Sequence, residues 1–164
     1  MLFRSLCRPL GGAAYESADH IVTLGGNDPA VSKILWCPFE ANTPLLTSAT
    51  VAGDGIWRHV AITFADGEHR LYVDGVLEAA ATTRLQFGRN PAAALGIGGL
   101  PGGRGQAAVG AIDELRIWSV ARSAEEIRAS LNRPLAGTEP GLAAYFPMDE
   151  GEGTVARDAS GSGW

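Results

Sequence analysis

The chain has 164 residues, a formal net charge of −5, 46% hydrophobic residues, 19% charged residues, 22 Gly and 9 Pro. This length fits one domain with a real core, and the composition excludes a disordered chain. The 13 basic residues are scattered singly, which argues against a nucleic-acid partner. No stretch is apolar for long enough to predict a signal peptide core or a membrane span, so we expect any export signal to lie upstream of Met1.

Cys7 and Cys37 are the only cysteines. They are candidates for a disulfide between neighbouring strands if the protein is exported, and two buried free thiols are the alternative.

The clearest predicted strands lie between Trp57 and Ala79, where segments rich in β-branched and aromatic residues flank two Asp-Gly pairs. Asp66-Gly67 and Asp74-Gly75 each suit a type I′ turn, because both central residues of that turn have positive φ. The segment is therefore predicted to form a three-stranded antiparallel meander.

In the first of these strands Val60, Ile62 and Phe64 alternate with His59, Ala61 and Thr63. A period of two predicts that one face of the strand packs inward.

Two more strands are predicted at 95–98 and 109–118, with a Gly-rich loop over 98–105 between them. The apolar phase shifts within the second of these strands. This shift predicts a β-bulge near Asp113 and Glu114, for which we expect a structural role.

A short helix is predicted from about Ala124 to Leu131. Ser123 and Glu126 have the spacing of a capping box, in which each side chain bonds the backbone N–H of the other residue. The apolar run 142–148 predicts a last strand, and 151–163 predicts a loop. Because strands dominate and the helix is short, two packed sheets are favoured over helical or alternating architectures.

Three segments carry a family resemblance: WRHVAITF…GEHRLYVDG, LGIGG and VGAIDELRIWSVARSAEEI. In order and spacing they resemble the laminin-G-like jelly-roll domains of the concanavalin A-like lectin/glucanase superfamily, which are related to pentraxins. The match covers about residues 45 to 132. It implies an all-β fold, a two-sheet antiparallel jelly-roll sandwich with one short C-terminal helix.

The later run GLAAYFPMDEGEGTVARDASGSG resembles the segment that opens such domains in bacterial members. We therefore expect a laminin-G-like domain over residues 1–141, whose N-terminal strands need not all be present. Residues 142–164 are expected to form either a closing strand or the start of a following repeat. Other domains of the same polypeptide are therefore expected partners.

Four acidic residues of this last segment are candidate calcium ligands: Asp149, Glu150, Glu152 and Asp158. They lie in a Gly-rich loop, and calcium favours carboxylate oxygens on flexible backbone. No Asp-x-Asp-x-Asp-Gly loop is present, so a solvated acidic loop is the alternative.

The sequence lacks the residue patterns of the main catalytic classes. The related glucanases use Glu-x-Asp-x-x-Glu on one strand, since a retaining mechanism needs two carboxyls roughly 5 Å apart. Glu150 and Glu152 have the right alternation, but glycines surround them and no third acidic residue follows in register. His20, His59 and His69 lack zinc-ligand spacing, and serine-nucleophile and nucleotide-binding motifs are absent. We therefore predict that the chain is not an enzyme.

Trp36, Trp57 and Trp118 are candidate stacking surfaces for a sugar ring. The alternative for Trp57 and Trp118 is burial in a sheet, and we favour burial for these two. Trp36 is less constrained by its surroundings in sequence.

The leading interpretation is an extracellular or cell-surface binding module that recognises glycan or a cell-surface protein. Its ligand is expected on loops at one rim, since loops vary while strands are fixed. The candidate loops are 87–93, 98–105 and 151–161. A structural spacer in a tandem array and a glycoside-hydrolase-related enzyme are the alternatives.

Overall fold

A computed structural model describes residues 6–7, 20–25, 32–38, 44–83, 97 and 110–163. Within these residues the chain forms short strands and one helix. In chain order the elements are β1 (Leu6–Cys7), β2 (His20–Gly25), β3 (Lys33–Pro38), β4 (Leu46–Val51), β5 (Val60–Ala65), β6 (Glu68–Val73), β7 (Val76–Thr82), β8 (Leu115–Trp118), α1 (Ala124–Ser130) and β9 (Leu142–Phe146).

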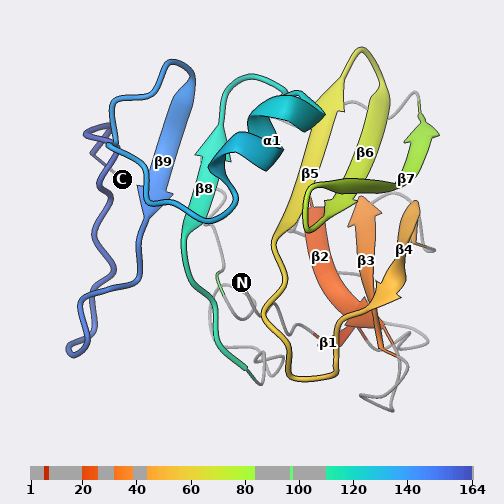
Figure 1. The fold of residues 1–164 in the computed structure, drawn as a ribbon, viewed down its shortest axis with the longest axis horizontal. Coiled ribbons are helices and arrows are strands. Elements are labelled where there is room, and N and C mark those ends of the chain that lie inside the picture. Colours follow the sequence, from red (N-terminus) through yellow and green to blue (C-terminus); the bar gives the residue numbers. More distant parts are fainter. Residues whose placement is uncertain are drawn as a thin grey trace.

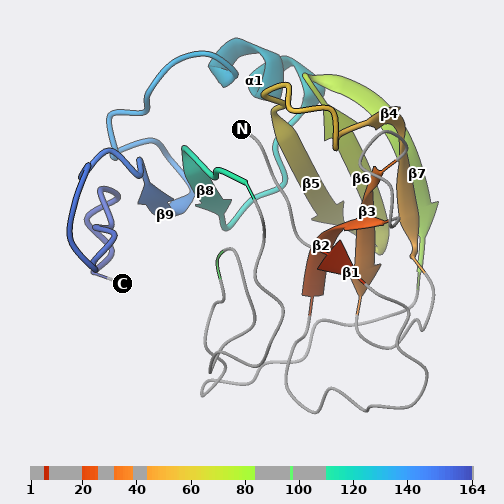
Figure 2. The same cartoon turned by 90° about the horizontal axis from the view of Figure 1, so that it is seen from below.

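The strands form two facing layers (Figures 1 and 2). One sheet has the order β1-β2-β3-β4 and the other β5-β6-β7, while β8 and β9 pair separately. Every pairing is antiparallel except that of β1 with β2. Figure 1 places β8 and β9 beside β5, on the side away from β7. The predicted all-β, two-sheet sandwich with one short helix is confirmed.

The predicted meander is β5-β6-β7, and both of its turns have the predicted conformation. Asp66 and Gly67 have φ of 52° and 80°, and Asp74 and Gly75 have φ of 50° and 76°. Both central residues of each turn are therefore left-handed, as a two-residue type I′ turn requires. These local turns set the register of the three strands.

The core lies between the two sheets. Ile34 and Leu46 from one sheet meet Leu71 and Val73 from the other, and all four side chains are buried. From β5, Val60 and Ile62 pack against this cluster, as the alternation predicted. The other face of β5 is also half-buried.

A buried hydrogen bond joins the two sheets at the centre of the sandwich. The indole N–H of Trp36 in β3 donates to Nδ1 of His69 in β6 at 3.0 Å. The His69 ring also lies 4.5 Å from the ring of Phe64. Trp36 is only 7% exposed, so its proposed role as a stacking surface for sugar is wrong. The residue shares the inward face of β3 with Ile34, and the facing sheet covers it.

Glu78 of β7 joins the edges of the two sheets. Its carboxylate accepts hydrogen bonds from the backbone N–H groups of Ala49 and Thr50 in β4, at 2.8 and 3.0 Å, and from the Thr50 hydroxyl. Edge strands expose unpaired backbone groups, and these bonds satisfy two of them. These hydrogen bonds therefore hold the two sheets together at the edge formed by β4 and β7.

The capping box at the start of α1 is confirmed. The N–H of Ser123 donates to the Glu126 carboxylate at 2.8 Å, and the N–H of Glu126 donates to the Ser123 hydroxyl at 3.2 Å. The helix ends at Ser130, with Leu131 as its C-cap, one residue earlier than predicted.

The predicted strand 109–118 is shorter than expected, because β8 covers only its last four residues. Glu114, just before β8, has a φ of 55°. The irregular register in the β8–β9 ladder falls between Ile117 and Trp118 rather than at the predicted bulge. The strand predicted at 95–98 lies outside the described residues except for Ile97, which is in a bend.

The last predicted strand is confirmed as β9, and residues 151–163 form the predicted loop. This loop bonds the outer edge of β9, since the N–H of Ala159 donates to the carbonyl of Tyr145 at 2.7 Å. Whether residues 142–164 close this domain or open a following repeat stays a prediction.

Strand β2 lies between β1, which holds Cys7, and β3, which holds Cys37. The two cysteines are therefore not on neighbouring strands, contrary to the expectation. Within the part of the chain that the structure describes, no helix has the length and apolar character to cross a membrane.

Candidate functional site

An exposed tryptophan lies on the connection between β4 and β5, which Figure 1 shows leading up to the start of β5. Trp57 is 52% exposed, and its neighbour Ile56 is exposed to the same degree. The burial predicted for Trp57 is therefore wrong. The residue precedes β5 by three positions, in the connection that follows β4. We call Asp54, Ile56, Trp57, Arg58 and Asp74 the Trp57 rim.

The backbone on the N-terminal side of Trp57 is held by Asp54. Its carboxylate accepts a hydrogen bond from the N–H of Ile56 at 3.1 Å, which is an Asx turn. The other carboxylate oxygen pairs with the Arg58 guanidinium at 2.9 Å. Gly55, inside this turn, has a φ of 80°, a conformation that other residues rarely adopt.

The backbone on the C-terminal side of Trp57 is held by Asp74, from the β6–β7 turn. The Asp74 carboxylate accepts from the N–H of His59 at 2.8 Å and pairs with Arg58 at 3.4 Å. The N–H of Asp74 in turn donates to the carbonyl of His59 at 2.8 Å. Trp57 is therefore an exposed indole on a backbone that is fixed on both sides.

Helix α1 supports the same turn from the other side. A Cβ atom on Gly75 would lie 2.6 Å from Cγ of Arg128, so only glycine fits here without a shift. Arg128 pairs with Glu125 at 3.1 Å and donates to the carbonyl of Gly75 at 3.4 Å. After the turn, Val76 and Leu77 are also exposed apolar residues.

The rim has an excess of negative charge. Its two carboxylates share one guanidinium, and the hydrogen bond from Ile56 lowers the pKa of Asp54. His59, beside the rim, has its pKa lowered to about 4, first by burial and then by the charge of Arg116. The imidazole is therefore neutral at neutral pH and does not offset the carboxylates.

Trp118 is half-buried, and it does not belong to the central core. The guanidinium of Arg122 lies over its ring at 4.3 Å, and Arg122 also pairs with Glu126 at 3.2 Å. Arg122 therefore covers one face of the Trp118 ring through a cation–π contact. Because Trp118 is only half-buried, the core packing predicted for it is wrong.

Asp113 and Glu114 have the structural role that was predicted. The Asp113 carboxylate accepts from the N–H of Glu114 at 3.0 Å. The Glu114 carboxylate accepts from the Tyr145 hydroxyl at 2.7 Å and pairs with Arg116 at 2.5 Å. Burial and the bond to Glu114 raise the pKa of Tyr145.

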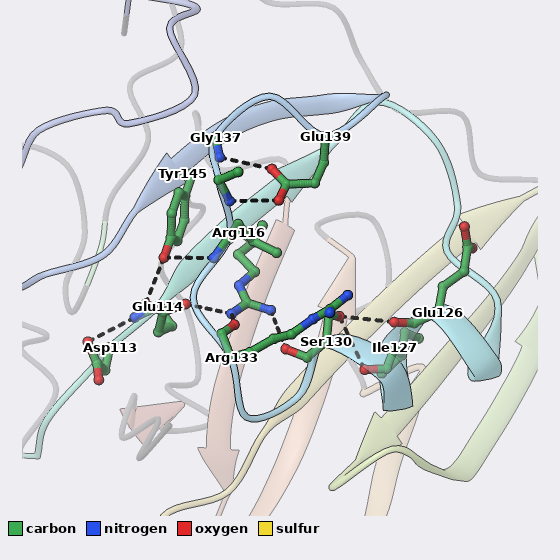
Figure 3. A network of polar contacts seen from close by, with 12 residues as sticks. Asp113, Glu114, Arg116, Glu126, Ile127, Ser130, Arg133, Gly137, Glu139 and Tyr145 are labelled. Carbon is green, nitrogen blue, oxygen red and sulfur yellow. Dashed lines mark hydrogen bonds and ion pairs between the residues drawn. The ribbon is translucent and has the colours of Figure 1, made fainter.

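Arg116 extends this network to the end of the helix (Figure 3). Its guanidinium donates to the carbonyls of Ser130 and Arg133 at 2.8 and 2.7 Å. A helix leaves its last carbonyls without intrahelical partners, and an arginine is well suited to satisfy them. These contacts explain why β8, α1 and β9 stay together, and they give the network a structural role.

Two of the four candidate calcium ligands already bond backbone groups. Asp158 accepts from the N–H groups of Tyr145 and Ser160, at 3.0 and 2.8 Å. Glu150 accepts from the N–H of Arg157 at 2.7 Å, and this bond lowers its pKa. Among the described residues, no group of three or more His, Cys, Asp or Glu side chains is placed to hold a metal ion. Calcium binding by Asp149, Glu150, Glu152 and Asp158 stays a prediction.

The loop after β9 surrounds an open hollow of about 460 Å³, lined by Glu150, Glu152, Gly153, Thr154, Val155 and Arg157. Of these residues Glu150 is half-buried and the others are exposed, and the set contains no aromatic ring. Glu150 and Glu152 lie here on solvated loop rather than facing each other on a strand. The hollow is therefore a weaker candidate than the Trp57 rim. The other candidate loops, 87–93 and 98–105, lie outside the described residues.

The chain belongs to a laminin G family of the concanavalin A-like lectin/glucanases superfamily. The family model matches residues 22–128, which is more than half of the chain. This confirms the family resemblance. The superfamily's description names lectins and glucanases together, so membership by itself assigns no reaction.

The fold is similar to the crystal structure of a candidate carbohydrate-binding protein from Bacteroides ovatus, with a TM-score of 0.62 and 26% sequence identity. The similarity covers 89% of this chain and 46% of that one, so this chain spans about half the length of its relative. An S-layer domain-containing protein from Clostridium thermocellum is more distant, with a TM-score of 0.42, 18% identity, and coverage of 73% and 66%. No curated protein matches the chain.

Proposed function

We propose that the chain is a carbohydrate-binding module that recognises its ligand without catalysis, as part of a longer extracellular polypeptide. The observation that carries the proposal is the Trp57 rim. Sugar rings pack their C–H groups on exposed aromatic faces, and their hydroxyls need fixed polar partners. The rim offers both, an exposed indole on the β4–β5 connection and two partly exposed carboxylates, one from this connection and one from the β6–β7 turn.

An exposed aromatic ring on a backbone that is fixed on both sides makes the Trp57 rim a better candidate than the acidic loop, whose hollow has no aromatic ring. A ligand that binds a preformed surface does not have to order it, so less free energy is lost on binding. The bonds of Asp54 and Asp74 fix the residues on both sides of Trp57 before any ligand arrives. Such supporting contacts are a common property of binding sites.

The similarity to the Bacteroides ovatus protein supports the same function, because it extends over most of this chain. The superfamily's lectins also bind carbohydrate on this fold. Glu150 and Glu152 lie on a loop rather than on a strand, which supports recognition over hydrolysis, since the related glucanases hold their two carboxyls at fixed positions on one strand. Calcium, a cell-surface protein as ligand and a spacer role stay as predictions for the test below.

The test is a glycan array probed with the wild-type chain, once with millimolar calcium and once with a chelator. Hits are then measured by calorimetry for Trp57→Ala and for Val155→Ala, which removes a still more exposed apolar side chain from the hollow. We expect Trp57→Ala to weaken binding at least roughly tenfold and Val155→Ala to leave it unchanged.

Absence of binding to every glycan would contradict the proposed function and favour a protein ligand or a spacer. Binding that is lost in Val155→Ala but kept in Trp57→Ala would instead place the site in the acidic loop. Loss of binding in the chelator would show a role for calcium.

A further inference from the structure

We infer that the Trp57 rim selects neutral saccharides and rejects acidic ones, such as glycans that carry uronic acid, sialic acid or sulfate. This inference rests on the proposed function and names the chemical class of its ligand. It follows from the charges around the exposed indole and from how they are already paired.

Both Nη atoms of the guanidinium within the rim already bond the rim's own carboxylates. Nη2 of Arg58 contacts Asp54 at 2.9 Å, and Nη1 contacts Asp74 at 3.4 Å. Its Nε atom is buried, out of reach of a ligand. A protein recognises a carboxylate or sulfate through charge-assisted hydrogen bonds from an available cation, most often an arginine that binds the anion with two N–H groups. In Arg58 these groups bond the protein's own carboxylates.

The charged groups next to the rim do not change the sign of its net charge. Arg128, which supports the Asp74-Gly75 turn, is balanced by Glu125. His59 is neutral at neutral pH because of its burial. Two carboxylates against one guanidinium therefore leave the rim with one negative charge, within a chain whose net charge is −5. An approaching anion is repelled, and the repulsion weakens as salt screens it.

The same carboxylates suit the hydroxyl groups of a neutral sugar. Each carboxylate oxygen has two lone pairs, and the hydrogen bonds of Asp54 and Asp74 use one lone pair on each oxygen. Both side chains are partly exposed, so the remaining lone pairs face water or ligand. Sugar hydroxyls donate to such acceptors, whereas a carboxylate or sulfate group offers only acceptors of its own. The rim therefore combines an apolar platform with acceptor sites.

The experiment compares two ligands that differ only at their primary hydroxyl positions, where one carries CH₂OH and the other a carboxylate, and the salt series separates the effect of the charge from that of the lost hydroxyl. A neutral oligosaccharide that binds the wild-type chain is oxidised at its primary hydroxyls to the corresponding uronic acid, and both are measured by calorimetry at low and high salt. We expect the neutral ligand to bind at least roughly tenfold more tightly at low salt, with a smaller difference at high salt.

Charge-removing variants test the assignment to the rim. Asp54→Asn and Asp74→Asn each remove the charge but keep a side-chain oxygen that can accept the backbone hydrogen bond. We expect each variant to reduce the ratio of the affinities for the neutral and acidic ligands severalfold. Glu150→Gln is the matched control, because it makes the same charge change on the distant exposed loop and should leave the preference unchanged. Thermal melting identifies any variant that fails to fold, and the salt series on the wild-type chain does not depend on the variants.

Equal or tighter binding of the acidic ligand by the wild-type chain would overturn the inference while leaving the proposed function intact. An equal effect of Glu150→Gln would also overturn it, since the selection would then come from the net charge of the whole chain. Self-association that Trp57→Ala abolishes, seen by light scattering, would show that a second copy covers the rim and would overturn it as well. If no neutral glycan binds at all, the proposed function fails first.

Discussion

Trp36 and Trp57 each follow an aliphatic residue in the sequence, Leu35 and Ile56, yet the structure gives them opposite surroundings. Trp36 lies between the two sheets, and its indole N–H bonds His69. Trp57 lies on the β4–β5 connection, where its neighbours hold the backbone but leave the ring exposed. The comparison teaches that a facing layer, rather than the local sequence, decides whether an aromatic ring supports the fold or is available to a ligand.

The two regions should therefore respond differently to mutation. Changes in the core between the sheets are expected to lower stability, and changes in the Trp57 rim are expected to lower binding. The following predictions test this separation.

The largest expected effect is that of Leu71→Ala, in the centre of the core, where the side chain is fully buried. Loss of apolar contacts and the cavity left behind should lower the free energy of unfolding by about 2–5 kcal/mol. Urea denaturation followed by fluorescence measures the change. Leu77→Ala, at an exposed position of the adjacent strand, is the matched control. Equal losses for the two variants would show that the facing sheets do not form the core described above.

The next effect is expected for Arg116→Met, which removes the guanidinium that joins β8 to the end of α1. Glu114 loses its partner and the carbonyls of Ser130 and Arg133 lose their donor, which should cost about 2–3 kcal/mol of unfolding free energy. Arg128→Met removes an exposed pair and should cost less than about 1 kcal/mol. Similar values for the two arginines would contradict the structural role of the network.

The two tryptophans themselves give a direct comparison. Trp36→Phe removes a buried donor and leaves Nδ1 of His69 without that bond, so stability should fall by about 1–3 kcal/mol. Trp57→Phe should change stability by less than about 0.5 kcal/mol, as is usual at the surface. Thermal melting measures both. Iodide quenching should decrease in Trp57→Phe and not in Trp36→Phe, and the reverse result would mean that the two environments are exchanged.

The smallest expected effect concerns pH. Burial, and then Arg116, lower the pKa of His59 from 6.5 to about 4, so the unfolded chain binds a proton more readily than the folded one. The contribution to stability is therefore complete above pH 6.5 and is lost as the pH falls towards 4. Because the ring is half-buried and partly screened, we expect about 1 kcal/mol. Urea titrations from pH 4 to 7 should show a slope that His59→Gln reduces, and an unchanged slope would contradict this assignment.

Local patterns predicted much of the fold. The Asp-Gly turns and the alternation in β5 placed the meander, because turn geometry and strand period depend on residues adjacent in sequence. The capping box placed α1 for the same reason. The predicted bulge was displaced, since the register of β8 also depends on its partner β9.

The candidate site was less predictable. Sequence alone assigned Trp57 to the core, and it gave no signal that Asp74 would hold the loop that carries Trp57. The pair Asp54 and Arg58, four residues apart, was the available local signal. Asp74 lies 16 residues from Arg58, and only the folded β5–β6–β7 sheet brings the two together.

The sequence by itself determined the turns, the strand alternation and the helix cap, since each depends on short-range backbone geometry and nearby hydrogen bonds. Only the tertiary structure decided which tryptophan is buried, which carboxylates bond backbone groups and where Arg116 is anchored. These outcomes depend on which faces the two sheets cover, and burial is set by contacts between residues far apart in the chain.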